Sequence, residues 1–232
     1  MAIDYNKRPA ANPPSAGGSP QGGGSPGGVS LSKVTLTKAA PSVSLTKRGA
    51  VGGQLRVNLQ WSAGVPQRKG LFGRSSGGGI DLDLACLWEF SDGTKGVVQA
   101  LGNAFQAPYN GAPIIRLDGD DRSGSNTAGE NMFIDLARLN EIRRILVFAF
   151  IYEGVPNWAS ADGVVTLFPT NSPEIEVRLD EADTNSPTCA IAMLENKGGE
   201  LVVHREVRYI RGGQADLDRA YGWGMEWTRG RK

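Results

Sequence analysis

The sequence predicts an all-β protein, a β-sandwich of mainly antiparallel strands with long loops and little helix. Short segments that alternate apolar and polar residues recur along the chain at intervals of roughly ten residues. Gly, Pro, Asn or Asp bound these segments, as is typical of turns between strands. No amphipathic helices of about 10–15 residues alternate with them, which argues against a parallel α/β sheet.

The N-terminal region differs in composition from the rest. Residues 9–28 contain only Pro, Gly, Ser, Ala, Asn and Gln. Such a segment buries too little apolar surface to offset its chain entropy. We therefore expect a disordered tail over residues 1–28, followed by one sandwich domain over residues 29–232.

The first strands are expected in three near-copies, VSLSK, VTLTK and VSLTK, within residues 29–47. Pro41 separates the second copy from the third, so two short strands are predicted. Each copy ends in a lysine, namely Lys33, Lys38 or Lys47, and lysines at a sheet edge discourage pairing with another chain.

The middle of the chain alternates more clearly. In QLRVNLQW, residues 54–61, every second side chain from Leu55 onwards is apolar. In IDLDLACLWEF, residues 80–90, the even positions are apolar, and the opposite face carries Asp81, Asp83 and Glu89. The turn signal SDGT and the segment KGVVQAL then predict the return strand of a hairpin.

Further strands follow on both sides of a fully apolar segment. APIIRLD and NMFIDL flank an acidic loop, and ILVFAFI, residues 145–151, is apolar on both faces, as in a central buried strand. GVVTLF, EIEVRLD, TCAIAML and ELVVHREVRYI complete the predicted strands. Helix is expected only as one turn in ARLNEI and over residues 214–221.

Composition argues against several classes of function. The net charge of +1 gives no basic footprint for nucleic acid. The two cysteines, Cys86 and Cys189, lie in apolar runs and favour a reducing compartment. No apolar signal segment begins the chain, and the apolar run 145–151 is far shorter than the about 20 residues of a membrane span. We expect a cytoplasmic protein without a membrane span.

Conventional catalytic and zinc chemistry has few candidate residues here. The single histidine, His204, lies on the polar face of a predicted strand, where an ordinary surface histidine is the simpler interpretation. With one histidine and two cysteines, the chain lacks the usual ligands of a zinc site.

Acidic residues gather in RLDGDDRSGSNTAGEN, residues 116–131. Its carboxylates are Asp118, Asp120, Asp121 and Glu130. Because like charges in a short loop repel, water and salt, the neighbouring Arg116 and Arg122, or a bound cation must neutralise them. Calcium takes about six to eight oxygen ligands, and a glycine-rich acidic loop can supply them. The spacing does not fit an EF-hand.

Asp81 and Asp83 form a second acidic feature. At positions i and i+2 of a strand they would project from one face about 7 Å apart. They are either part of a solvated polar face or ligands of a cation shared with the acidic loop.

Several motifs together resemble the TerD family of tellurium-resistance and stress proteins. They are VSLSK…VSLTK, DLDLACLW, LDGDDRSG…GEN-x-FIDL, RILVFAFIYEG and YGWGMEW, in that order over about residues 29–230. The long acidic loop and the YGWG ending are most similar to the TerA branch. The resemblance implies a calcium-binding, cytoplasmic β-sandwich without catalysis. It also implies partners among other tellurium-resistance and stress proteins, in a complex at the inner face of the membrane.

The resemblance also implies a ligand set for calcium. Its motifs fall on Asp81, Asp83, Asp120, Asp121 and Glu130. The family commonly has two aspartates just before the last glutamate, where this chain has Ala128 and Gly129. Asp118 and Asn126 are the candidates to compensate.

Two other functions remain open from the residues alone. One is a hydrolase with paired carboxylates, for example a glycosidase, with tryptophans such as Trp158, Trp223 and Trp227 lining a sugar groove. Trp61 and Trp88 lie on apolar strand faces and are expected in the core instead. The other is a calcium-dependent module that docks on a membrane or a partner. Close clustering of the carboxylates would favour binding over hydrolysis.

Overall fold

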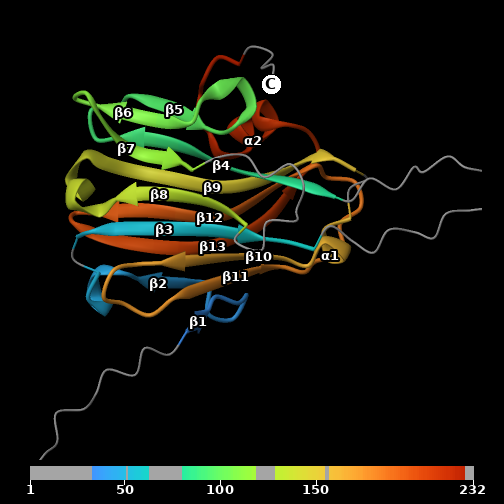
Figure 1. Cartoon of the computed structure of the whole chain (residues 1–232), viewed down its shortest axis with the longest axis horizontal. Helices are drawn as coiled ribbons and strands as arrows, with labels where there is room; N and C mark the ends of the chain where they lie inside the picture. The colour runs from blue at the N-terminus through green and yellow to red at the C-terminus, as the bar shows by residue number, and fades with distance from the viewer. Residues whose placement is uncertain (1–32, 51, 63–79, 119–128, 155–156, 228–232) are drawn as a thin grey trace, which may run out of the picture. The chain divides into compact units, whose positions relative to one another are not determined.

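The computed structural model describes residues 33–50, 52–62, 80–118, 129–154 and 157–227. Within these ranges two stacked sheets form a sandwich (Figure 1), so the predicted fold class is confirmed. The seven-stranded sheet has the order β1-β11-β10-β3-β8-β7-β6, and the six-stranded sheet has the order β2-β13-β12-β9-β4-β5. Neighbouring strands are antiparallel, except that β1 pairs with β11 in parallel. The predicted tail over residues 1–28 lies outside the described residues.

The strands of the seven-stranded sheet are β1 (Val34–Thr35), β3 (Gln54–Gln60), β6 (Gln106–Tyr109), β7 (Ala112–Leu117), β8 (Glu130–Asp135), β10 (Gly163–Phe168) and β11 (Ile175–Leu179). Those of the six-stranded sheet are β2 (Ser42–Ser44), β4 (Asp81–Phe90), β5 (Lys95–Val98), β9 (Ile142–Glu153), β12 (Thr188–Lys197) and β13 (Glu200–Ile210). The helices are η1 (Thr46–Arg48), η2 (Leu101–Asn103), η3 (Leu136–Glu141), α1 (Trp158–Ala161) and α2 (Gln214–Tyr221).

Alternating side chains build the core between the sheets. On β3, Leu55, Val57 and Leu59 are fully buried against the six-stranded sheet. Burying each such side chain stabilises the fold by about 1.5–3 kcal/mol. The predicted hairpin of β4 and β5, the central position of β9 and the helix over 214–221 are all confirmed. The short strand β6 was not predicted.

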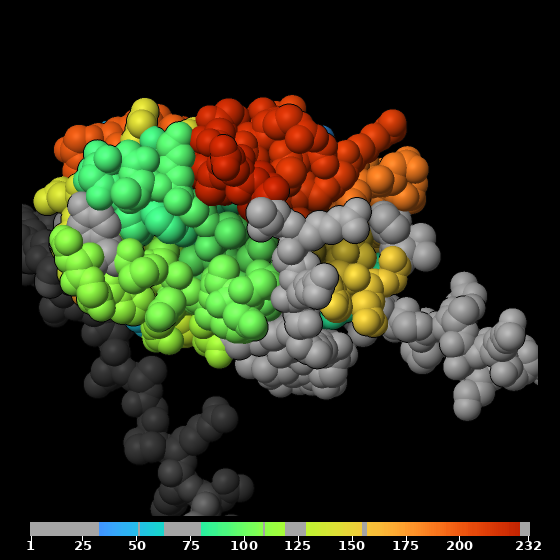
Figure 2. Space-filling view, turned by 90° about the horizontal axis from the view of Figure 1, so that it is seen from above, coloured from blue at the N-terminus to red at the C-terminus, as the bar shows by residue number. Residues whose placement is uncertain are grey.

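A second core covers the outer face of the six-stranded sheet. Leu217 of α2 and Trp223 are fully buried there against Leu87 and Phe148. Figure 2 shows this C-terminal segment beside the green residues around β5, where Lys95 Nζ donates to the Trp223 carbonyl at 2.8 Å. Because both faces of this sheet are covered, ILVFAFI is apolar on both faces.

This second core corrects one expectation. A solvated polar face on β4 was open from the sequence, but the acids of that face are buried: Asp81 is 7% exposed, Asp83 0% and Glu89 1%. Glu89 is compensated by Arg143 at 2.5 Å and Arg144 at 2.6 Å. Burial opposes ionisation of Glu89, but the two arginines outweigh it and hold its pKa below the usual range.

The second N-terminal repeat contains β1 and the third overlaps β2, which confirms two short strands at sheet edges. The first repeat, apart from Lys33, lies outside the described residues. The two strands lie at the edges of different sheets. The three lysines also form ion pairs, Lys33 with Glu176 of β11 at 2.6 Å, Lys38 with Glu181 after the end of β11 at 3.0 Å, and Lys47 with Glu200 of β13 at 3.0 Å.

Candidate metal centre

The first residues of β4 carry two buried carboxylates. Asp83 continues the outer-face row of Ala85 and Leu87, and its neighbour across the β9 ladder is Phe150. Asp81 pairs in register with Glu153, and a register shift falls between Asp81 and Leu82. Like charges opposite one another in an antiparallel pair are destabilising. The register thus places two acidic residues opposite one another at this end of β4.

Glu130 reaches the same strand from the other sheet. It begins β8 and faces the sandwich interior, as do the fully buried Met132 and Ile134 that follow it. The pairing of β5 with β4 ends at Cys86, so β5 does not reach Leu84. The Leu84 N–H donates instead to Glu130 Oε2 at 2.6 Å. The peptide strand that carries Asp83 is thus bound by a carboxylate from the opposite sheet.

The acidic loop is closed at its base by Asp118 and Asn131. Asp118 N–H donates to the Asn131 carbonyl at 3.0 Å. In return, the backbone N–H and the Nδ2 of Asn131 donate to the Asp118 carboxylate at 3.1 and 2.9 Å. Both oxygens of Asp118 therefore already accept a hydrogen bond, and its first role is to fix where the loop begins and ends.

Gly129 explains one departure from the resembled family. Its φ is +65°, and a Cβ at this position would lie 2.1 Å from the carbonyl oxygen of Leu59. The backbone of β3 leaves no room for a side chain there, so an aspartate cannot replace Gly129 in this arrangement. The missing carboxylate follows from the close approach of the loop exit to β3.

The carboxylates at this site are the type of ligand that a hard cation prefers. Asp81, Asp83 and Glu130 offer oxygen atoms from two sheets at one end of the sandwich, and calcium binds oxygen. Within the described ranges, however, no group of three or more His, Cys, Asp or Glu side chains is arranged to hold a metal ion. The predicted ligands Asp120, Asp121 and Asn126 lie outside the described residues, as does Arg122.

Two residues of this region were not predicted from the sequence. Glu153 ends the β9 strand and meets Asp81 only because β9 and β4 are neighbours in the sheet. Asn131 directly follows Glu130, and its Oδ1 accepts from Asn58 Nδ2 at 2.9 Å and Arg56 at 3.1 Å. Glu153 could have been found in the sequence as an acidic residue near the end of the apolar run 145–151. Asn131 could have been found because it directly follows Glu130.

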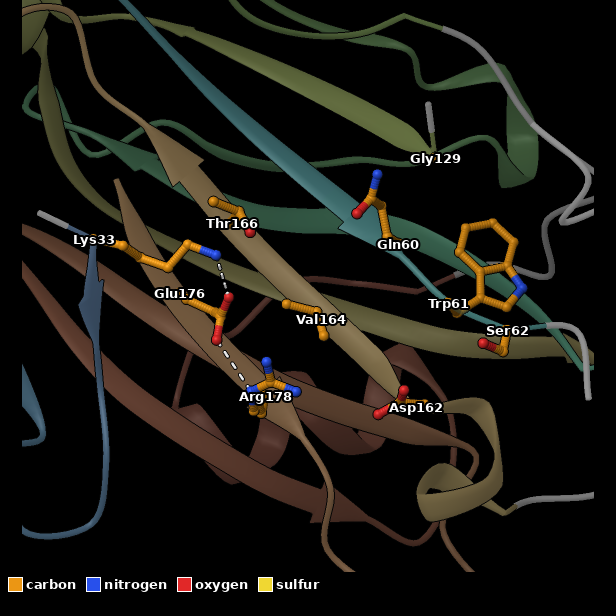
Figure 3. Close-up of a pocket in the computed structure, with 10 residues that line it drawn as sticks. All are labelled: Lys33, Gln60, Trp61, Ser62, Gly129, Asp162, Val164, Thr166, Glu176 and Arg178. Atoms are coloured by element: carbon orange, nitrogen blue, oxygen red, sulfur yellow. Dashed lines mark hydrogen bonds and ion pairs between the residues drawn. The ribbon is translucent and has the colours of Figure 1, made fainter. Parts of the chain in front are cut away.

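A pocket of about 530 Å³ lies beside the loop exit, on the outer face of the seven-stranded sheet (Figure 3). Gly129, Gln60 and Trp61 line one side, and Glu176 lies between Lys33 and Arg178 on the other. Lys33 binds Glu176 at 2.6 Å and Arg178 binds it at 3.0 Å. The hydrogen bond from Lys33, with the charges of both cations, holds the pKa of Glu176 below its usual range despite burial.

Two tryptophans are unavailable for the sugar groove that a glycosidase would need. Trp158 and Trp223 are fully buried, and their Nε1 atoms donate to the carbonyls of Ser186 and Trp88. Trp61 lies at the pocket and donates to the Ile80 carbonyl at 3.0 Å. The only described histidine, His204, pairs with Glu195 at 3.2 Å on β13, as an ordinary surface histidine does.

Fold and site together define a two-layered β-sandwich with buried carboxylates on β4 and β8, and with an acidic segment in the sequence between β7 and β8. No family model matches the sequence. The chain is 47% identical over 207 residues to a tellurium resistance protein TerA from an Alcaligenes species, covering 88% of this chain and 60% of that protein. This identity confirms the predicted resemblance to the tellurium-resistance proteins, on the TerA side.

Two solved structures resemble the fold. A protein of unknown function, SAV2460, superposes with a TM-score of 0.55 at 16% identity, over 74% of this chain and 98% of its own. A homologue of the telluride resistance protein TerD, SCO6318 from Streptomyces coelicolor A3(2), gives a TM-score of 0.49 at 18% identity, over 75% and 98%. In the described part of the chain, no helix is both long and apolar enough to cross a membrane.

Proposed function

We propose that the chain is a calcium-binding, non-enzymatic protein of tellurite and stress resistance, which acts in the cytoplasm as an interaction module of a multi-protein complex. The relation to a TerA protein supports the resistance role. The chain spans only 60% of that relative, so its resistance role belongs to this proposal.

The hydrogen bond between Glu130 and the Leu84 N–H carries the calcium part of the proposal. It brings a carboxylate of β8 to the strand that holds Asp81 and Asp83, which are buried. Burying ionised carboxylates close together is costly unless positive charge compensates them. The same strand end also faces Glu153.

A bound ion would supply positive charge at this end and tie the two sheets together. Asp81, Asp83 and Glu130 would hold it from the strands, and Asp120, Asp121 and Asn126 from the acidic loop. Asp118 would serve mainly by closing the loop, since Asn131 already occupies both of its oxygens.

The test is the thermal stability of the purified chain with calcium, magnesium or chelator. A ligand at 100 times its dissociation constant stabilises by about 2.7 kcal/mol. We expect the melting temperature to rise with calcium and to return with chelator. The rise should be lost in Asp83→Asn and kept in Asp180→Asn, a matched change at an exposed position.

The resistance role has its own readout. In cells whose tellurite tolerance depends on this chain, Asp83→Asn should lower tolerance while Asp180→Asn should not. Absence of any calcium shift at millimolar concentration would reject the metal part of the proposal. A hydrolytic activity abolished by Asp83→Asn would favour the paired-carboxylate enzyme instead.

A further inference from the structure

Four side chains of alternating type cross the outer face of the seven-stranded sheet in one register row. Phe168 of β10 pairs with Arg56 of β3, Arg56 pairs with Phe133 of β8, and Phe133 pairs with Arg116 of β7. Residues directly opposite one another project from the same face of a sheet. We call these four residues the arginine–phenylalanine row.

Both arginines lie over aromatic rings. The guanidinium of Arg56 lies 3.8 Å from the ring centroid of Phe168, and that of Arg116 lies 4.3 Å from the centroid of Phe133. Arg56 also donates to Asn131 Oδ1 at 3.1 Å. These contacts already restrict the rotamers of the two arginines. A ligand that binds them therefore costs less side-chain entropy.

The row carries positive charge that the described residues do not neutralise. No described carboxylate forms an ion pair with Arg56 or Arg116. Arg116 is exposed and Arg56 is half-buried. On the same face, Lys33 and Arg178 both bind the carboxylate of Glu176 in the pocket, and Asp162 also lines it, so the positive charge of this face lies in the row itself.

The outer faces of the two sheets differ in whether a helix packs on them. On the six-stranded sheet, α2 and Trp223 bury the outer face. Among the described helices, none packs on the outer face of the seven-stranded sheet, so its row of arginines and phenylalanines faces outward. Arginine and aromatic residues are the types enriched at energetically important positions of protein interfaces.

We propose that the arginine–phenylalanine row is a docking surface for an acidic segment of a partner protein, whose carboxylates bind Arg56 and Arg116. The inference rests on the proposed interaction role and names its surface. Planar guanidinium groups bind carboxylates through two parallel hydrogen bonds, and the phenylalanines beside them add apolar contact. A continuous phosphate chain fits this face less well, because the row offers only two guanidinium groups, Arg56 and Arg116, for charge-assisted contacts. The net charge of +1 also disfavours nucleic acid.

The experiment measures binding of a fluorescein-labelled oligoglutamate peptide to the whole chain by fluorescence anisotropy at low salt. An oligoglutamine peptide, oligothymidylate and phosphatidylserine–phosphatidylcholine vesicles are the comparison probes. We expect oligoglutamate to bind best, and Arg56→Gln and Arg116→Gln each to weaken it roughly tenfold, the effect of one charge-assisted contact. Arg116→Lys, which keeps the charge but not the planar group, should give an intermediate loss.

Arg48→Gln is the matched control, since Arg48 is exposed on η1, outside the row. It should leave binding unchanged. Equal losses in Arg48→Gln and Arg116→Gln, or tighter binding of oligothymidylate or vesicles than of the peptide, would overturn the proposal. Melting curves establish that each variant is folded, and Arg116→Gln, at an exposed site, keeps the test usable if Arg56→Gln is unstable. Calcium titration of the same samples is independent, so loss of the calcium response rejects the proposed function without affecting this result.

Discussion

At the scale of single residues, Glu130 combines a structural hydrogen bond with a candidate metal-binding carboxylate. Two substitutions separate these roles. Glu130→Gln keeps an oxygen that can accept from the Leu84 N–H and removes the charge, so the calcium-free fold should keep its stability while calcium binds more weakly. Glu130→Ala also leaves a buried N–H without its acceptor, which costs about 1–3 kcal/mol.

Urea unfolding of the calcium-free protein measures the first quantity and calorimetric calcium titration the second. Glu174→Gln, at an exposed position, is the control. If Glu130→Gln destabilises the calcium-free fold as much as Glu130→Ala does, the carboxylate's charge matters for folding and the separation of roles is wrong.

Asp83 and Glu130 should act on one binding event if a single ion bridges the sheets. Each of Asp83→Asn and Glu130→Gln should weaken calcium, and the double variant should lose less than the sum of the two. Additivity is expected only for independent sites. Calorimetry of wild type, both single variants and the double variant gives the coupling. Strictly additive losses would instead indicate two separate ions.

Glu176 predicts a pH effect that does not involve metal. Lys33 and Arg178 depress its pKa below the ordinary value of 4.5. A carboxyl group with a depressed pKa stabilises the fold above its unfolded pKa, and the stabilisation is lost as the pH falls through the folded pKa. In chelator, the difference in unfolding free energy between wild type and Glu176→Gln should therefore be constant near neutral pH. It should shrink below pH of about 4.5. A difference that stays constant into acid would show that the two cations do not stabilise the ionised form.

At the scale of elements, Asp218 holds the C-terminal segment in place. Its carboxylate accepts from the backbone N–H groups of Gly224 at 2.8 Å and Met225 at 2.9 Å, and from Trp227 Nε1 at 3.0 Å. Asp218 is itself 3% exposed. Asp218→Ala should lower the unfolding free energy by about 3 kcal/mol or more, since it leaves several donors without an acceptor.

Tryptophan fluorescence of the folded protein is the second readout for Asp218→Ala, because Trp223 should become more accessible to quencher. Asp180→Asn should change neither stability nor quenching. Unchanged quenching in Asp218→Ala would mean that apolar contacts alone keep Trp223 buried.

The strands could be predicted because the alternation of apolar and polar residues is a local pattern. Which elements pack on each face of a sheet cannot be read from a local pattern. The sequence of β4 indicates one apolar face correctly. The burial of Asp83 and Glu89 depends on packing around residues far along the chain, which no local pattern contains. The strand β6 lacks alternation, contains Pro108 and has a register shift next to it, so its only signal was its partner β7. Pro108 at the sheet edge does not interrupt a central ladder.

The candidate site was predictable in part for the same reason. The acidic motifs identify Asp81, Asp83 and Glu130, but not that Glu130 binds the Leu84 N–H or that Glu153 faces Asp81. These contacts depend on which strands are neighbours and which sheet faces which. The close approach of Gly129 to β3 is likewise a property of the folded pair of strands.

At the scale of the whole molecule, the composition of residues 1–28 predicts that they add nothing to the folded core. Deleting them should leave the melting temperature and the calcium response unchanged within error. Differential scanning calorimetry of the full and shortened chains checks this. A large fall in melting temperature would show that part of the tail packs on the sandwich.

The position of the second core late in the chain has a consequence for biosynthesis. Residues 214–227 leave the ribosome after all the described strands, yet they bury Leu87 and Phe148 on the six-stranded sheet. During translation that sheet therefore exposes an apolar outer face until Trp223 has emerged. A nascent chain halted before α2 would present this face to chaperones and to other nascent chains. Quality control of this protein thus depends on completing a short segment that contributes no strand.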